Sequence, residues 1–242
     1  MKTERPLSLN RTVLKYIALA AMLCDHYAFF MVPRQTLLYS ILRCFGRFTA
    51  PIMCMFLAEG FIHTSSHKKY ALRLGVFALI TQIPWTLALN GTLHTRRLFT
   101  DWNMIYTLFL SFLFLYVCRY VNDLRIRPLL LAGLFSLTYF GDWGLYAPIF
   151  VYIFYRFRDD ARKRSFFYTA VAAISVIDSV STPLGNGYPL RLCLWTSGVF
   201  LVIPLLLSYN GKKGSSHPFH KWIFYVVYAA QFYVFYCLRF RV

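Results

Sequence analysis

The sequence contains few charged residues, and acidic residues are the scarcest among them. Only 14% of the 242 residues are Asp, Glu, Lys or Arg, whereas 58% are hydrophobic. Soluble domains average about 25% charged and about 45–50% apolar residues, so this composition excludes an ordinary soluble domain. Apolar runs recur from residue 12 to residue 238 with short connections. We therefore predict one integral membrane domain over residues 1–242, an all-α polytopic transmembrane helical bundle in a lipid bilayer.

Motifs that would assign a known chemistry are also missing. The sequence has no GxSxG nucleophile motif, no Walker-type glycine loop, no HExxH zinc motif and no visible internal repeat. Its six cysteines are scattered through apolar runs without CxxC spacing, which favours buried free thiols over a zinc site or a disulfide framework. We therefore expect no metal cofactor.

Apolar segments of helix length predict nine spans, within a range of about 8–10. The segments are 12–32, 37–63, 70–90, 101–119, 128–141, 144–157, 166–180, 187–208 and 219–238. The fifth and sixth are short for a full crossing and meet at the sequence GDWG, so they also fit a pair of half-helices.

Basic residues gather in the connections that these spans would place on one side. The net charge of +17 comes from 26 Lys and Arg against 9 Asp and Glu. In a soluble protein this excess would suggest nucleic acid, but cytoplasmic loops of polytopic proteins collect Lys and Arg for another reason, their orientation in the membrane. We predict an inner (cytoplasmic) membrane protein with a cytoplasmic N-terminus and no nucleic-acid partner. Arg34 and Arg43, near the outer end, are expected to extend to the interface.

The first apolar segment carries three polar side chains that are costly to place in lipid: Lys15, Asp25 and His26. Lys15 and His26 are eleven residues apart, which at about 100° and 1.5 Å per residue puts them on nearly one helix face, roughly 16 Å apart. Asp25 points about 100° away from His26. A charge in the hydrocarbon core costs at least about 2.5–3.5 kcal/mol, so such residues face a bundle interior, a partner or a wet cavity. We interpret them as the start of an active site.

The second apolar segment adds a cation and a carboxylate. Arg47 lies near its middle and Glu59 near its inner end, with His63 one turn further. In the predicted orientation Lys15 and Glu59 lie towards the cytoplasm, while His26 and Arg47 lie deeper. We predict a Lys15–Glu59 pair, which is either part of a site or only a buried salt bridge, and a deeper region that contains His26 and Arg47.

Three further positions place polar residues in or beside apolar segments. Asn103 opens the fourth segment, and Asp142 sits in a Gly-flanked break, where irregular backbone is tolerated only beside protein or water. The turn YNGKKG is ordinary loop chemistry, although Lys212 and Lys213 with nearby backbone amides are also suited to phosphate. Asn103, Asp142 and His63 are therefore candidate substrate-binding or structural polar residues.

Several of these stretches together resemble the TraX family of membrane proteins, and the resemblance covers nearly the whole chain. It is carried by LKYIALAAMLCDH, GRFTAPIMCMFLAEGFIHT with KKYALRL following, Asn103 with Thr107, Asp142 with Gly144, YNGKKG and KWIFYVVY. The family is named for the enzyme that acetylates the N-terminus of F-type conjugative pilin. The resemblance therefore implies acetyl transfer from acetyl-CoA, in a conjugation setting.

The resemblance also implies a wider relationship and one departure. The family is distantly similar to the acyltransferase 3 type of transmembrane acyltransferases, which carry a basic residue, ten intervening residues and a His in their first span. Lys15 and His26 have that spacing. Where the family usually has Tyr-Pro-x-His, this chain has Tyr228-Ala229-Ala230-Gln231, and Gln231 cannot act as a base.

Two functional interpretations follow, and they belong to different classes. In the first, the protein is an acetyltransferase in which His26 removes a proton from an amine or hydroxyl acceptor or briefly carries the acetyl group. The acceptor is a small molecule, a peptide or a glycan. The candidate catalytic residues are His26, Asp25 and Arg47, and the candidate acetyl-CoA-binding residues are Lys15, Glu59, Lys212 and Lys213.

In the second interpretation the protein is a non-enzymatic proton-coupled transporter or a membrane assembly factor. Intramembrane Asp, Glu, His and Arg side chains also suit a proton-coupled carrier. Such carriers often contain repeated halves with matching helix breaks, and the sequence shows only the one break at 141–144.

Overall fold

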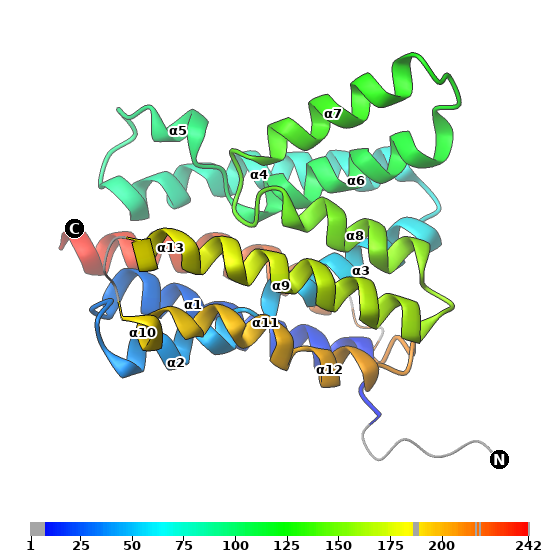
Figure 1. Ribbon diagram of the computed structural model, residues 1–242. Helices are drawn as coiled ribbons and strands as arrows, with labels where there is room; N and C mark the ends of the chain where they lie inside the picture. Colours follow the sequence, from blue (N-terminus) through cyan, green and yellow to red (C-terminus); the bar gives the residue numbers. More distant parts are fainter. Residues whose placement is uncertain (1–7, 186–188, 216, 218, 242) are drawn as a thin grey trace. The chain divides into compact units, whose positions relative to one another are not determined.

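The computed structural model describes residues 8–185, 189–215, 217 and 219–241, and this backbone is helical apart from turns and two isolated bridges. The helices are α1 (Arg11–Met31), α2 (Leu37–Gly46), α3 (Thr49–His63), α4 (His67–Asn90), α5 (Arg97–Thr100), α6 (Met104–Tyr120), α7 (Ile126–Thr138), α8 (Tyr146–Arg156), α9 (Ala161–Gly185), α10 (Leu190–Cys193), η1 (Leu194–Ser197), α11 (Gly198–Leu201), α12 (Ile203–Leu207) and α13 (Phe219–Phe240). The all-α prediction is confirmed for the described residues (Figure 1).

Internal contacts divide the chain into two compact units. The first unit consists of 1–52 and 172–227, and the second unit consists of 53–171 and 228–242. Three helices, α3, α9 and α13, contribute residues to both units. The earlier assignment of one integral domain stays a prediction.

Four described helical segments are long and apolar enough to cross a membrane. They are Arg11–Met31, Leu37–His63, His67–Asn90 and Trp222–Phe240. Three shorter apolar segments, Met104–Tyr120, Ile126–Thr138 and Leu194–Leu207, fall below a full crossing length. A multi-pass membrane protein is therefore supported by length and composition, whereas the count of nine spans is not confirmed.

In the first unit, the beginning of α1 is held by the turn 208–214. Leu9 forms a parallel bridge with Tyr209, and the Arg11 N–H donates to the Lys212 carbonyl at 2.9 Å. These bonds join segments about two hundred positions apart in sequence. They place the start of α1 and this basic turn at one end of the unit, as the predicted orientation requires.

A glycine makes this close approach possible. The Asn10 side chain caps α1 by accepting a hydrogen bond from the Val13 N–H, and the Thr12 hydroxyl donates to the Lys213 carbonyl at 3.2 Å. Gly214 has a φ of 73°, and a Cβ there would lie 2.7 Å from polar atoms of both Asn10 and Thr12. Only glycine meets both requirements at this position.

The predicted second span, 37–63, is two helices rather than one. α2 ends at Gly46 and α3 begins at Thr49, so Arg47 caps α2 instead of lying inside a continuous helix. Pro51 supplies the physical reason, because its ring clashes with the carbonyl of residue 47 in a continuous helix and its nitrogen cannot donate. Proline is tolerated in the first turn of α3, which fixes the position of the break.

The segment 190–207 is also interrupted. The helical turns α10, α11 and α12 are short, and η1 between α10 and α11 is a 3₁₀ turn. In the first unit η1 and α11 pack against α2. The chain therefore has more helix breaks than its sequence suggested. A mid-helix 3₁₀ turn often marks a functional hinge or a strained sequence.

The second unit is organised around α6, which packs against α4, α7 and α8 (Figure 1). The connection from α7 to α8 turns beside the start of α6, where Trp102 forms a bridge with Gly141. A Cβ on Gly141 would collide with the Thr107 hydroxyl, so the turn needs a glycine there. Phe112, Leu115 and Phe150 are fully buried in the core of the protein.

The orientation yields a labelling experiment. Ser215 is exposed just beyond the turn 208–214, and we expect a Ser215→Cys variant in intact cells to resist a membrane-impermeant thiol reagent, because the turn is predicted to be cytoplasmic. A Thr92→Cys variant, in the exposed connection after α4, is the control and is expected to be labelled from outside. Rapid external labelling at residue 215 would reverse the orientation.

Candidate functional site

The carboxylate of Asp25 binds two arginine side chains from α2 and its C-cap. Arg43 Nη1 donates to Asp25 Oδ2 at 2.6 Å, and Arg47 Nη2 donates to Asp25 Oδ1 at 3.2 Å. Only 12%, 13% and 16% of the side-chain surface of Arg43, Asp25 and Arg47 is exposed, so the pairs are largely withdrawn from solvent. The three side chains together carry one more positive than negative charge.

The indole ring of Trp195 covers both guanidinium groups. Its centroid lies 4.5 Å from the guanidinium carbon of Arg43 and 4.8 Å from that of Arg47. The rings of Phe29 and Tyr39 lie 5.4 Å and 5.9 Å from the Arg43 carbon. A cation–π contact contributes about 0.5–1 kcal/mol when exposed and about 2 kcal/mol or more when desolvated. We call Asp25, Arg43, Arg47 and Trp195 the Asp25 cluster.

The expectation that Arg43 extends to the interface is wrong. Its guanidinium group pairs with Asp25 and is surrounded by aromatic rings, so the charge is stabilised inside the first unit and does not need to reach water. Arg34, by contrast, is exposed, and its guanidinium carbon lies 5.9 Å from the Phe29 ring.

Two glycines allow the backbones to approach closely around the cluster. A Cβ on Gly46 would collide with the Asp25 side chain, and a Cβ on Gly198 would collide with the Cys44 carbonyl oxygen. Gly46 is buried at the end of α2, and Gly198 begins α11. The sequence therefore places glycine where α1 and α11 approach α2.

His26 directly follows Asp25 on α1 and is 6% exposed. The imidazole is therefore buried within the protein, and its place inside the membrane stays a prediction. Arg47, which we expected in a deeper region with His26, forms an ion pair with Asp25. The catalytic assignment of His26, Asp25 and Arg47 stays a prediction.

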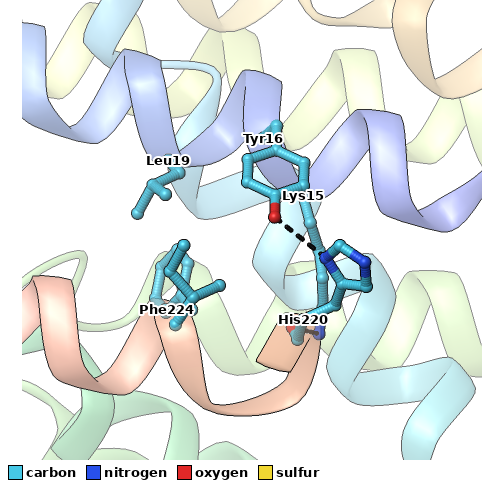
Figure 2. Close-up of a pocket in the computed structure, with 6 residues that line it drawn as sticks. Lys15, Tyr16, Leu19, His220 and Phe224 are labelled. Atoms are coloured by element: carbon cyan, nitrogen blue, oxygen red, sulfur yellow. Dashed lines mark hydrogen bonds between the residues drawn. The ribbon is translucent and has the colours of Figure 1, made fainter. Parts of the chain in front are cut away.

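Lys15 lies towards the other end of α1, beside the start of α13. Its ammonium group donates to the His220 carbonyl at 3.1 Å, and the Tyr16 hydroxyl lies 2.9 Å from His220 Nδ1. Figure 2 shows these side chains around a small pocket whose other walls are Leu19, Ile223 and Phe224. Half of the lining residues are apolar, and the other half, Lys15, Tyr16 and His220, carry polar groups.

The other residues assigned to acetyl-CoA lie in different surroundings. Lys212 and Lys213 are exposed on the turn beside the start of α1. Glu59 is half-buried in α3. Lys15 belongs to the first unit and Glu59 to the second, so their predicted pairing stays a prediction.

Asn103 is fully buried and organises the beginning of α6. Its Oδ1 accepts from the N–H groups of Ile105 and Tyr106, and its Nδ2 donates to the Ala78 carbonyl at 2.8 Å and to Gln82 Oε1 at 2.9 Å. The amide therefore serves as helix cap and as a cross-link to α4. A structural role accounts for both ends of this side chain.

Asp142 and His63 lie at the surface. Asp142 is exposed; its carboxylate accepts from the Trp143 N–H, and its carbonyl accepts from the Thr107 hydroxyl at 2.8 Å. His63 is exposed at the last residue of α3. Among the residues that the structure describes, no group of three or more His, Cys, Asp or Glu side chains is arranged to hold a metal ion.

Replacement of Asn103 gives a stability prediction. Asn103→Ala removes the cap and the two buried hydrogen bonds to Ala78 and Gln82, so we expect a loss of about 1 kcal/mol for the cap and about 0.5–1.5 kcal/mol for each hydrogen bond. Thermal unfolding in a neutral detergent measures it. Asn122→Ala, at an exposed connection, is the control and should stay within about 0.5 kcal/mol of the parent. Equal stability of the two variants would contradict the structural role.

Sequence reasoning did not assign two members of the Asp25 cluster. Arg43 carried a usable signal, because residues four apart on a helix share a face and Arg43 and Arg47 therefore point the same way. Trp195 carried no local signal, since it lies far along the chain in an interrupted apolar segment.

Comparisons with known proteins agree over nearly the full length of the chain. The family model described as "TraX protein" matches residues 10–239. A curated relative, "Probable fimbrial assembly protein FimC, serogroup H1" from Dichelobacter nodosus, is 29% identical over 230 residues, which cover 93% of each chain. No solved structure matches the chain.

Proposed function

The chain belongs to the TraX family, and from this membership and the buried polar groups of α1 we propose that it is a membrane-embedded acetyltransferase. The observation that carries the proposal is a buried imidazole, His26, directly beside a carboxylate that is held by two arginines. Acetyl-CoA supplies an activated thioester. The wider similarity to acyltransferase 3 proteins stays a prediction.

His26 acts as the general base in this proposal. An ammonium or hydroxyl acceptor must lose a proton before or as its nitrogen or oxygen attacks the thioester carbonyl, and imidazole is suited to that transfer near neutral pH. The new C–N or C–O bond forms as the C–S bond breaks, and CoA leaves as the thiol after it takes up a proton. Burial of His26 keeps bulk water away from the reacting groups.

Arg47 stabilises negative charge that develops on the thioester oxygen, or holds a carboxylate of the acceptor. A guanidinium group has five N–H donors, and Nη2 of Arg47 donates to the Asp25 carboxylate. Asp25 fixes the position of the guanidinium group, so its role in this proposal is to position Arg47.

The basic end of the first unit is suited to the phosphates of CoA. Lys212 and Lys213 are exposed on one turn, and their ammonium groups have no hydrogen-bond or ion-pair partner among the described residues. Lys15 lies about one helical turn after Arg11, the first residue of α1, whose N–H donates to the Lys212 carbonyl. In the proposed inner-membrane orientation this end faces the cytoplasm, where acetyl-CoA is made.

The experiment that tests the proposal is transfer of labelled acetyl from acetyl-CoA by purified protein in lipid. Peptides with a free N-terminal amine, the same peptides with a blocked N-terminus, and glycans with free hydroxyls serve as acceptors. Label on the free-amine peptides alone would assign the amine class. Absence of transfer to every acceptor, with protein that is folded and binds no acetyl-CoA, would overturn the proposal.

A second candidate function is that of a non-enzymatic factor in fimbrial assembly, and the printed name of the Dichelobacter nodosus relative favours it. In this case deletion of the gene abolishes surface fimbriae, whereas a His26→Ala protein restores them fully. An acetyltransferase whose product is needed for assembly gives the opposite result for His26→Ala. Electron microscopy of complemented cells separates the two candidates.

A further inference from the structure

The connection between α8 and α9, in the second unit, is rich in basic residues. Residues 156–164 contain five Lys or Arg against two Asp. Figure 1 shows this connection as the short turn in which α8 leads into α9. Its exposed basic side chains are those of Arg156, Arg158, Arg162 and Lys163. The predicted cytoplasmic orientation accounts for basic residues on this side of the membrane, but not for the side chains that surround them.

Both acidic side chains of this connection already have partners. The Asp159 carboxylate accepts a hydrogen bond from Arg158 Nε at 3.1 Å. The Asp160 carboxylate accepts one from the Lys163 N–H at 3.0 Å and lies 3.5 Å from the Lys163 ammonium group. The two carboxylates are therefore matched to Arg158 and Lys163.

The guanidinium groups of Arg156 and Arg162 are not matched in this way. Neither forms a hydrogen bond or an ion pair with the part of the chain that the structure describes, although the Arg156 guanidinium carbon lies 5.7 Å from the Phe157 ring. Arg162 is the second residue of α9, where the helix dipole disfavours a cation. Helix electrostatics therefore gives no reason for Arg162, and both exposed guanidinium groups are accessible to an anion from outside the chain.

Exposed aromatic rings lie next to these charges. Phe166 is 69% exposed and Phe167 is 41% exposed. The Phe167 ring stacks on the Phe157 ring, with centroids 4.7 Å apart and ring planes at 6° to each other. A phenyl ring is unfavourable in water, whereas the boundary between lipid headgroups and acyl chains accommodates basic and aromatic groups side by side. The combination therefore fits a lipid better than a soluble partner.

We propose that residues 156–167, which we call the α8–α9 patch, bind an anionic phospholipid. Arg156 and Arg162 hold its phosphate headgroup, and its acyl chains contact Phe166 and Phe167. Guanidinium groups bind phosphate in two-point contacts, and basic residues beside a membrane attract anionic lipids. A soluble phosphate would match the charges but leave the rings in water. This inference concerns lipid binding, and it stands whether or not the protein transfers acetyl groups.

The test measures lipid binding to the full-length protein in a neutral detergent, by native mass spectrometry over a lipid titration. Phosphatidylglycerol is the anionic probe, and phosphatidylcholine with the same acyl chains is the zwitterionic comparison. Glycerol 3-phosphate carries the phosphate without acyl chains. We expect phosphatidylglycerol to bind saturably and more tightly than phosphatidylcholine, and glycerol 3-phosphate at equal concentration not to displace it.

The two arginines are tested against a charge-matched control. Each Lys or Arg near an anionic lipid strengthens binding by about a factor of five, so the double variant Arg156→Gln/Arg162→Gln should bind phosphatidylglycerol on the order of 25-fold more weakly. Its affinity for phosphatidylcholine should equal that of the parent. Lys68→Gln/Lys69→Gln removes the same charge from the exposed first turn of α4, on the same predicted side, and should bind phosphatidylglycerol like the parent.

Three results would overturn the proposal. The first is a parent-like phosphatidylglycerol affinity in the arginine double variant. The second is equal weakening in the arginine and lysine double variants, which would indicate diffuse attraction by all basic connections. The third is displacement of phosphatidylglycerol by an equal concentration of glycerol 3-phosphate, which would indicate a soluble ligand. If the arginine double variant does not fold, the single variants Arg156→Gln and Arg162→Gln decide instead, each with an expected loss of about fivefold.

Discussion

His26→Ala is expected to lower the rate of acetyl transfer by a factor on the order of 10²–10⁴, because removal of a general base has this effect. His26 is buried on α1 beside Asp25, so water cannot readily replace its imidazole as a base. The measurement is specific activity for each mole of monodisperse protein, which separates chemistry from folding. If His26 has only a structural role, His26→Ala should instead lower the free energy of unfolding by about 1–3 kcal/mol, and total activity should fall only in proportion to the folded protein.

The matched control is His94→Ala, which removes an imidazole from an exposed connection and should leave specific activity unchanged. Arg47→Ala is expected to have low specific activity, and Arg47→Lys should recover little of that activity, since an ammonium group lacks the planar two-point geometry of a guanidinium group. If His26→Ala keeps most of the parent activity, the proposed base is wrong, and Asp142 and the His63–His67 region become the next residues to test.

Gly46→Ala is expected to destabilise the protein although alanine favours helices. The added Cβ would collide with the Asp25 side chain, so α1 and α2 must separate or the ion pairs must break. Overpacking costs about 1–3 kcal/mol, and breaking a buried ion pair costs about 3–5 kcal/mol. These costs exceed the helix-propensity gain of about 1 kcal/mol. The unfolding temperature should therefore fall.

Gly133→Ala is the control with the opposite expected sign. Gly133 lies within α7, and a Cβ there would meet no atom within 4 Å. The substitution should therefore stabilise the protein by about 0.4–1 kcal/mol through the unfolded state and helix propensity. Stabilisation of both variants would show that α1 and α2 do not approach at Gly46 as described.

The helical class and several helix starts could be predicted because they depend on local sequence. Composition alone indicates membrane helices, and Asn103 was correctly placed at the start of a helix, where its side chain caps α6. The break at Arg47 was missed although Pro51 was visible, because a continuous apolar run outweighed one proline in the interpretation. The interruptions within 190–207 were missed for the same reason.

The candidate site could be predicted only in its local part. Lys15, Asp25 and His26 share one helix, so periodicity places them. The partners of Asp25 depend on how α1 meets α2, and the cover by Trp195 depends on a segment about 150 residues later. Periodicity gives the face of each helix but not which faces meet, so Arg43 was assigned to the interface and Trp195 was not assigned at all.

The turn that holds the start of α1 has a consequence for biosynthesis. Because the bonds from Leu9 and Arg11 reach Tyr209 and Lys212, the first unit stays incomplete until the ribosome has made residues 53–171 and then the rest of this unit, 172–227. At about 5–20 residues per second, the roughly 200 residues between these partners take about 10–40 s to make. During most of that interval Asp25, Arg43 and Arg47 are present in the nascent chain, but Trp195 has not yet been made. Residues 53–171 of the second unit are therefore already made when the turn 208–214 bonds to the start of α1.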